Sequence, residues 1–183
     1  MMSDREILAA IDAGEIEIDP FNANQLQPAS YDLLLGDSVQ IVNERDLVAG
    51  FYGAKVFDIT TDVTSWHEFS LPRAVHKNDF VLGSTFERIR LGPGIAMQLT
   101  GKSTVGRHGL TVHITAGHVD PGWDGDLTLE IANLGPFGLM LTPRMPIAQA
   151  VFFRLGKPCD HPYAGQYQGQ RGPRAPGLLK RYL

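Results

Sequence analysis

The sequence of residues 113–133 is HITAGHVDPGWDGDLTLEIAN, in which a polar turn containing glycine and proline leads into a stretch of alternating apolar and polar residues. Side chains alternate between the two faces of a β-strand, so Glu130 points the same way as Asp126 and Thr128, and the apolar residues between them point the other way. A carboxylate held mid-strand among apolar neighbours is suited to proton transfer near neutral pH. The alternation also fits a solvent-facing glutamate on an outer strand, so the pattern alone leaves both interpretations open.

Stretches of this kind recur along the chain and are separated by Gly, Pro, Asn and Asp, which is typical of an all-β sandwich or barrel. Before the first of them, Ser3 and Glu6 have the spacing of a capping box, and apolar residues recur at helical intervals until Gly14. We therefore predict a mainly β protein with one short N-terminal helix. The clearest predicted strands are Ser38–Val42, Phe80–Thr85, Ile95–Leu99, Leu110–Thr115, Leu127–Ala132 and Ile147–Phe153.

Length and composition limit the domain organisation. With 183 residues, 43% of them hydrophobic and 20% charged, the chain is expected to form one soluble domain over residues 1–155. Residues 156–183 are rich in Gly and Pro and lack apolar periodicity, so they are predicted to form a tail that finds its contacts on that domain. Cys159 is the single cysteine, which excludes an internal disulfide and fits a reducing compartment.

Charge and hydropathy limit the classes of partner. The net charge of −4 provides no global basic field for nucleic acid, although a few clustered cations can still bind a small polyanion. No apolar run approaches the roughly 18 residues of a membrane span, and the N-terminal MMSDREILAAIDAGE is acidic where a signal peptide is cationic. We therefore expect a cytoplasmic protein that binds neither nucleic acid nor membrane.

A second candidate site follows the predicted strand Ile95–Leu99 and has the sequence GKSTVGR, residues 101–107. Backbone N–H groups of small residues can approach phosphate oxygens, and Lys102 and Arg107 can add charge-assisted hydrogen bonds. Glycine and serine between strands are also ordinary turn residues, which is the plainer interpretation of this segment taken alone.

The two stretches resemble, in order and spacing, motifs of the dUTPase and dCTP deaminase superfamily. The resemblance runs from SDREI near the N-terminus to YQGQRGP in the tail and includes PASYDL at 28–33, PIAQ at 146–149, Tyr163 and the QRG at 170–172. It implies a distorted β-barrel or jelly-roll fold, assembled as a homotrimer with each active site at a subunit boundary.

Position 130 separates the two chemistries of this superfamily. The dUTPases carry an apolar residue ten positions after the motif aspartate, whereas dCTP deaminases carry glutamate, and counting from Asp120 leads to Glu130. The resemblance therefore implies a dCTP deaminase, which converts dCTP to dUTP and ammonia in the supply of dUMP and dTTP. Ala116-Gly117 resembles the bifunctional members, which form dUMP and diphosphate, so that activity is the alternative. A plain dUTPase and a non-catalytic nucleotide-binding protein are further alternatives.

The resemblance also assigns roles to residues. Glu130 is implied to be the general base and acid, with Ser103 and Arg107 orienting the water and the cytosine; Arg107 would keep Glu130 ionised. Asp120 is implied to face the deoxyribose, and the Thr128–Leu129 backbone to border the base. The full set of implied substrate contacts is Lys102, Ser103, Thr104, Val105, Gly106, Arg107, Asp120, Thr128, Leu129, Glu130, Gln149, Tyr163, Gln166 and Gln170.

The cofactor expectations are Mg²⁺ and no zinc. Mg²⁺ is expected on the substrate triphosphate without a direct protein ligand. Zinc-dependent cytidine deaminases need a Pro-Cys-x-x-Cys motif, and Pro158-Cys159 has no second cysteine. His113 and His118 are the closest pair for a metal, but on a strand their spacing places them on opposite faces, so structural histidines are the plainer interpretation.

The tail carries one departure from the family pattern. Gln166 stands where many deaminases of the family have a lysine, so a triphosphate contact is weaker here or comes from Arg171 or Arg174. Because the tail contains implied contact residues but no core of its own, we expect it to close over bound nucleotide. Feedback inhibition by dTTP is common in the family and is an expectation from the resemblance alone.

Overall fold

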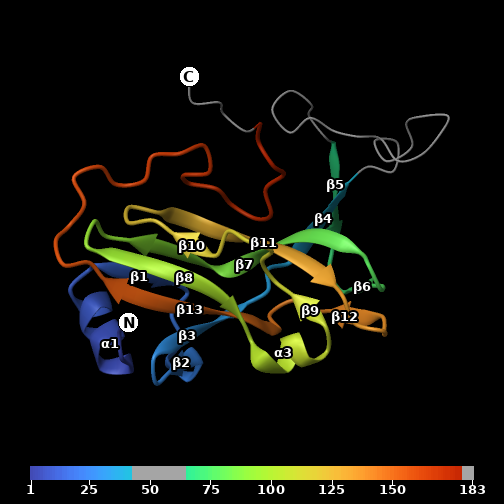
Figure 1. Ribbon diagram of the computed structural model, residues 1–183, viewed down its shortest axis with the longest axis horizontal. Helices are drawn as coiled ribbons and strands as arrows, with labels where there is room; N and C mark the ends of the chain where they lie inside the picture. The colour runs from blue at the N-terminus through green and yellow to red at the C-terminus, as the bar shows by residue number, and fades with distance from the viewer. Residues whose placement is uncertain (43–64, 179–183) are drawn as a thin grey trace.

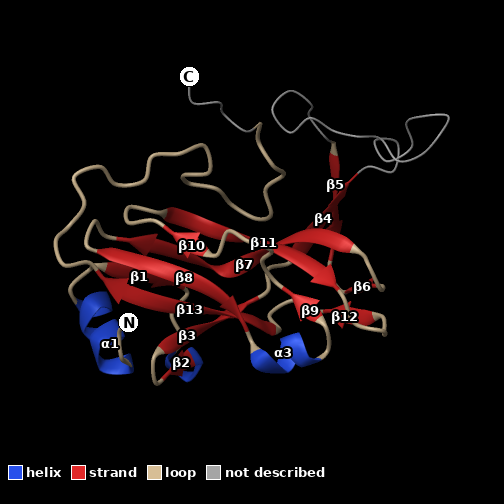
Figure 2. Ribbon diagram, in the orientation of Figure 1, coloured by secondary structure: helices blue, strands red, loops and turns tan. Residues whose placement is uncertain are grey.

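Strands are the predominant regular secondary structure of the computed structural model, which describes residues 1–42 and 65–178 (Figure 2). The prediction of a mainly β fold is therefore confirmed. No helix within these residues is long and apolar enough to cross a membrane.

The predicted N-terminal helix is α1, Asp4–Asp12, and it begins with the predicted capping box. The Ser3 amide donates to Glu6 Oε2 at 2.7 Å, and the Glu6 amide donates back to Ser3 Oγ at 3.4 Å. The chain leaves the helix through Gly14, whose φ of 70° is a conformation that favours glycine. The Met2 amide donates to Phe152 O at 2.8 Å, so the start of the chain is fixed to the sheet that holds Phe152.

Two antiparallel sheets form the body of the molecule (Figure 1). The first has the order β5-β4-β7-β11-β9, with β1 added to β7. Its strands are β1 Ile16–Asp19, β4 Ser38–Val42, β5 Trp66–Ser70, β7 Phe80–Leu91, β9 Leu110–Thr111 and β11 Asp124–Asn133.

The second sheet has the order β10-β8-β13-β3-β2, and a separate pair joins β12 to β6. Buried apolar side chains of the first sheet, such as Leu129, and of the second, such as Phe152, belong to a single core cluster. The strands are β2 Leu26–Gln27, β3 Ser30–Leu34, β6 Arg73–Val75, β8 Ile95–Gly101, β10 His118–Val119, β12 Leu139–Leu141 and β13 Pro146–Arg154, and the short helices are η1 Ala23–Gln25 and α3 Ser103–Arg107.

A bulge interrupts the pairing of β11 with β7 between Asp126 and Thr128. There the Thr85 hydroxyl accepts a hydrogen bond from the Leu127 amide at 2.9 Å and donates to Glu87 O at 2.8 Å. A side chain thus replaces the missing strand partner of a buried amide. Beyond the bulge the pairing resumes and brings Glu130 opposite Leu82.

One predicted strand is wrong in extent. Strand β9 stops at Thr111, whereas the apolar pattern predicted a strand to Thr115. The Thr111 hydroxyl donates to His113 O at 2.8 Å, which stabilises a turn in place of continued pairing. The Ile114 amide then donates to the carboxylate of Glu130 instead of to a neighbouring strand. The other predicted strands are present, and most extend beyond the predicted ends.

The remaining differences concern short elements. The GKSTVGR segment, predicted only as a connection, contains helix α3. Several strands of two or three residues, such as β2, β6 and β12, were not predicted because they are too short to show an alternating pattern. The described part of the tail, residues 156–178, contains neither helix nor strand, in agreement with its composition.

Candidate active site

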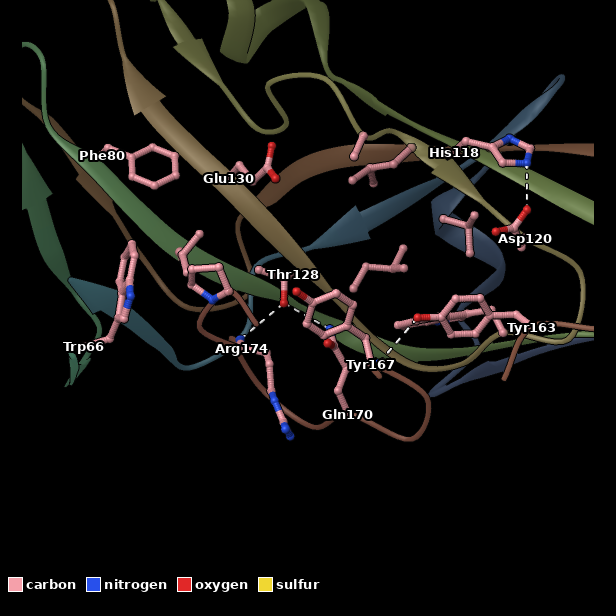
Figure 3. Close-up of a pocket in the computed structure, with 17 residues that line it drawn as sticks. Trp66, Phe80, His118, Asp120, Thr128, Glu130, Tyr163, Tyr167, Gln170 and Arg174 are labelled. Carbon is pink, nitrogen blue, oxygen red and sulfur yellow. Dashed lines mark hydrogen bonds and ion pairs between the residues drawn. The ribbon is translucent and has the colours of Figure 1, made fainter. Parts of the chain in front are cut away.

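A cavity of about 350 Å³ opens between β11, the β10 turn and the tail (Figure 3). Its walls combine carboxylates, aromatic rings and strand side chains from segments that are far apart in the sequence. The lining residues are Trp66, Phe80, Leu82, Leu99, Ala116, His118, Val119, Asp120, Trp123, Leu127, Thr128, Glu130, Tyr163, Tyr167, Gln170, Arg174 and Pro176.

Glu130 lies half-buried on β11 and projects toward this cavity beside Phe80 (Figure 3). Its Oε2 accepts a hydrogen bond from the Ile114 amide at 2.8 Å. That bond fixes one oxygen, and the other remains available to accept a proton from water. The Glu130 side chain is therefore partly sheltered in a cavity and is not a fully solvent-facing group on an outer strand.

The loop that provides the Ile114 amide is held closely against β8. A Cβ atom added to Gly117 would lie 2.4 Å from Gln98 Nε2 and 2.7 Å from Leu99 O. The Leu99 amide also donates to Gly117 O at 2.6 Å. A residue without a side chain is thus required for this approach, which links the Ala116-Gly117 pair to the position of the loop.

Asp120 is the second carboxylate of the cavity. It is exposed, it follows β10, and its Oδ1 lies 3.3 Å from His118 Nε2 (Figure 3). Asp120 and Glu130 occupy different walls of the same cavity. A ligand in the cavity can therefore meet a carboxylate at each of two positions.

The tail supplies a third wall. Tyr163 packs against Trp123 with ring centroids 5.5 Å apart, and Tyr167 also lines the cavity. The Thr128 hydroxyl accepts hydrogen bonds from Gln170 Nε2 at 3.0 Å and from the Arg174 amide at 3.2 Å. The tail therefore lies on the same strand face that presents Glu130.

A second polar group forms around Asp32 on β3, away from this cavity. Lys102 Nζ lies 2.6 Å from Asp32 Oδ2, and Gln149 Nε2 donates to Asp32 Oδ1 at 2.9 Å. Lys102, Ser103 and Gln149 line a separate cavity of about 500 Å³. The predicted phosphate-binding segment and the predicted PIAQ motif are thus brought together, with Asp32 between them.

The predicted site residues consequently divide into two groups within one chain. The first, around Glu130, contains Asp120, Thr128, Tyr163 and Gln170. The second, around Asp32, contains Lys102, Ser103, Gly106 and Gln149; Thr104 and Val105 line a further apolar cavity beside them.

Three predicted contacts lie outside these cavities. Arg107 is exposed at the end of α3 and lines none of the three cavities, so one chain does not place it beside Glu130. The Leu129 side chain is fully buried in the core, which leaves its backbone as the part that can border a ligand. Gln166 is exposed and does not line the Glu130 cavity.

Several lining residues were not predicted. Trp66 and Phe80 form an edge-to-face aromatic pair with centroids 6.3 Å apart, and Phe80 lies beside Glu130 (Figure 3). Nothing in the local sequence distinguishes them from core aromatics, because their position depends on strand pairing. Asp32 was missed although it lies within the PASYDL motif, where a carboxylate among apolar strand residues is an available signal.

The described part of the chain offers few potential metal ligands close to one another. Among residues 1–42 and 65–178, no three His, Cys, Asp or Glu side chains are grouped to hold a metal ion. His113 and His118 line different cavities, but not as opposite faces of one strand, because β9 ends at Thr111 and only His118 lies on a strand, β10.

Comparisons with known proteins agree with this architecture. A family model described as dCTP deaminase-like matches residues 1–155. A protein of Nocardioides sp. named dCTP deaminase, dUMP-forming, is 42% identical over 178 residues, covering 94% of this chain and 92% of its own length. A protein of the same name from Streptomyces coelicolor is 39% identical, with 96% and 93% covered.

Among solved structures, the 2'-deoxycytidine 5'-triphosphate deaminase of Agrobacterium tumefaciens is similar in fold, with a TM-score of 0.63 at 23% identity. The match covers 85% of this chain and 48% of that one. The family match over most of the chain and the similarity to relatives over nearly their full length lead to one conclusion: the chain belongs to the dCTP deaminase-like family.

Proposed function

We propose that this protein deaminates dCTP and hydrolyses the resulting dUTP, so that it releases ammonia, dUMP and diphosphate. The observation that carries the proposal is that two carboxylates, Glu130 and Asp120, line one cavity. The relatives named as dUMP-forming support this bifunctional alternative over the main sequence-based expectation, in which dUTP is the product. The close packing of Gly117 on β8 agrees with the same choice.

In the first step, Glu130 takes a proton from water as that water attacks C4 of cytosine. The bond between C4 and the exocyclic nitrogen then breaks, and Glu130 delivers the proton that lets ammonia leave. The bond from the Ile114 amide orients the carboxylate for both transfers. General acid–base assistance of this kind contributes on the order of 10²–10⁴ in rate. No zinc is invoked in this step, since the chain's single cysteine cannot form the Cys-x-x-Cys zinc motif of the cytidine deaminases.

In the second step, Asp120 accepts a proton from a water that attacks the α-phosphorus of dUTP. The bond between the α-phosphorus and the oxygen that bridges it to the β-phosphorus breaks, and the products are dUMP and diphosphate. Mg²⁺ bound to the triphosphate would neutralise charge on the leaving diphosphate. Among the described lining residues only Asp120 and Glu130 are carboxylates, so they cannot provide all six oxygen ligands of Mg²⁺. Phosphate and water oxygens would occupy most of its ligand positions.

The complete site is proposed to need a second subunit. Ser103, Arg107 and Lys102 lie apart from Glu130 within one chain, so a neighbouring copy would bring its α3 segment to the Glu130 cavity. Three large apolar side chains, Leu134, Phe137 and Met140, are 58–69% exposed, which is an available surface for assembly. A cyclic homotrimer provides three equivalent boundaries of this kind.

A product time course tests the proposed activity. Purified protein with dCTP and Mg²⁺ is expected to release ammonia, dUMP and diphosphate in equal amounts, whereas accumulation of dUTP would identify a deaminase alone. Conversion of dUTP with no action on dCTP would identify a plain dUTPase. Nucleotide binding without any turnover would support a non-catalytic protein. Adding dTTP to the same assay tests feedback inhibition.

A further inference from the structure

The tail is hydrogen-bonded to the domain at several points, and one of them is a carboxylate, Asp126, that does not itself line the Glu130 cavity. Asp126 Oδ1 lies 3.1 Å from Arg171 Nη1, and its Oδ2 accepts a hydrogen bond from the Gly172 amide at 2.8 Å. The Asp126 side chain is only 13% exposed, whereas that of Arg171 is 63% exposed. The tail therefore covers a carboxylate that would otherwise face solvent.

Backbone contacts reinforce this attachment. The Asp126 amide donates to Gln170 O at 3.1 Å, and Gln170 Nε2 donates back to Asp126 O at 2.6 Å. A Cβ atom on Gly125, whose φ is 150°, would lie 2.9 Å from Gln170 O. Glycine before Asp126 thus permits the close approach, and residues 170–172 contact Asp126 through both backbone and side chain.

These contacts lie next to the part of the tail that brings Gln170 and Arg174 to the cavity. Gln170 is 6% exposed and reaches Thr128, and the Arg174 amide donates to the same Thr128 hydroxyl. Both residues lie within three positions of Arg171. Holding residues 171 and 172 at Asp126 therefore fixes the tail on the strand face that carries Glu130.

We propose that Asp126 is a positioning residue for the reaction, which acts by holding the tail in the place where Gln170 and Arg174 complete the substrate cavity. This inference rests on the proposed function for its effect on catalysis, but not for its effect on the tail. It also assigns the two tail arginines to different tasks: Arg171 neutralises Asp126, and Arg174, which lines the cavity, is left to meet the anionic substrate.

The electrostatic reason is the charge of the ligand. A triphosphate beside a sheltered and unpaired carboxylate would be repelled, so a cation on Asp126 is needed for the strand to accept it. The pair differs from the exposed ion pairs of the molecule, such as Arg90 with Glu17, because one partner is nearly covered and also accepts a backbone hydrogen bond.

The test is a double-mutant cycle with Asp126→Asn and Arg171→Gln, together with Asp126→Ala, in the full-length protein. The first measurement is hydrogen exchange of the Arg174 amide, which bonds to Thr128 and not to either mutated side chain. The second is kcat/KM for dCTP. We expect Asp126→Ala to speed that exchange and to lower kcat/KM by about ten-fold each, which is typical for loss of a charged hydrogen bond.

Arg171→Gln leaves the carboxylate unpaired, so it should lower kcat/KM at least as much as Asp126→Asn does, and the double variant should be no worse than Arg171→Gln alone, because the two side chains act as a pair. Additive effects would overturn the pairing, and native exchange with unchanged kcat/KM in Asp126→Ala would overturn the proposal. Asp124→Asn is the matched control. The Asp124 side chain bonds to Arg88 of β7, and only its backbone bonds to the tail, so the substitution should reduce stability without exposing the Arg174 amide.

The exchange measurement needs no turnover. A wild-type protein that does not act on dCTP, but whose tail is loosened by Asp126→Ala, would contradict the proposed function and leave the positioning role in place. A protein that acts on dCTP, but whose Arg174 amide exchanges at the wild-type rate in Asp126→Ala, would contradict the positioning role and leave the proposed function in place.

Discussion

At the residue scale, the proposed deamination depends on how Glu130 is held. Its strand partner is Leu82, its neighbour in the cavity is Phe80, and one carboxylate oxygen accepts the Ile114 amide. This arrangement shelters the group without burying it, so water can reach the free oxygen. The loop that donates the amide is in turn held at Gly117, which links the position of Glu130 to a backbone contact with β8.

Replacing Glu130 by glutamine should abolish ammonia release from dCTP, because the amide cannot accept the water proton. Its carbonyl oxygen can still accept the Ile114 hydrogen bond, so the site geometry and nucleotide binding should be retained. Steady-state ammonia release and calorimetric titration with dCTP check the two halves of this prediction. A variant that turns over at a rate near that of the wild type would refute the assigned role.

At the element scale, a bulge interrupts the pairing of β7 with β11, the strand that carries Glu130. The Thr85 hydroxyl is fully enclosed and bonds to both the Leu127 amide and Glu87 O. A buried amide that loses its acceptor costs about 1–3 kcal/mol.

Thr85→Val keeps the branched shape and removes the hydroxyl, so it should lower the free energy of unfolding by about 1–3 kcal/mol. Urea denaturation measures this change. The control is Thr100→Val on β8, where the hydroxyl donates to the adjacent and accessible Gly101 O and the expected change is within about 0.5 kcal/mol. Equal effects in the two variants would contradict the role given to the bulge.

The elements also show how far the sequence alone leads. Alternation located β4, β8, β11 and β13, and the capping box located α1, because these signals are local and repeat over several residues. Strands of two or three residues carry no such repeat. The loop after Thr111 does not form the strand that its apolar pattern predicted. The Thr111 hydroxyl and the Glu130 carboxylate bond to its backbone in place of a neighbouring strand.

The site divides in the same way. Glu130 and Asp120 were found from motif spacing, and the structure places both at one cavity. Trp66, Phe80 and the Asp126 attachment could not be found from local sequence, because they depend on which strands and which part of the tail come together.

At the scale of the whole molecule, a buried carboxylate should make stability depend on pH. Burial raises the pKa of Glu87, and hydrogen bonds from Gln25 Nε2 and the Leu34 amide offset part of that rise. The folded state therefore binds the Glu87 proton more tightly than the unfolded chain does. Its contribution to stability is largest below the pKa of the same carboxyl in the unfolded chain and falls as the pH rises through the folded pKa.

Comparing the wild type with Glu87→Gln by urea denaturation, from about pH 4 upward, isolates this contribution. The stability of the wild type relative to the variant should decline as the pH rises, since the variant cannot ionise at this position. Parallel stability curves would show that Glu87 does not titrate as its burial requires.

The proposed assembly predicts complementation between inactive subunits. Glu130→Gln and Arg107→Ala should each be inactive alone, since each lacks one half of every site. If the halves come from different subunits, mixing the two variants by denaturation and refolding should restore about a quarter of the sites in random trimers. No recovery, with trimers confirmed by analytical ultracentrifugation, would place both residues in the same subunit's site.

The most direct measurement of the division of labour between the two carboxylates is the product pattern of Asp120→Asn acting on dCTP. The wild type should form dUMP and diphosphate with each ammonia released, and the variant should still release ammonia but accumulate dUTP. Continued formation of dUMP by the variant at the wild-type rate, or a wild type that stops at dUTP, would contradict the assignment of two hydrolyses to one cavity.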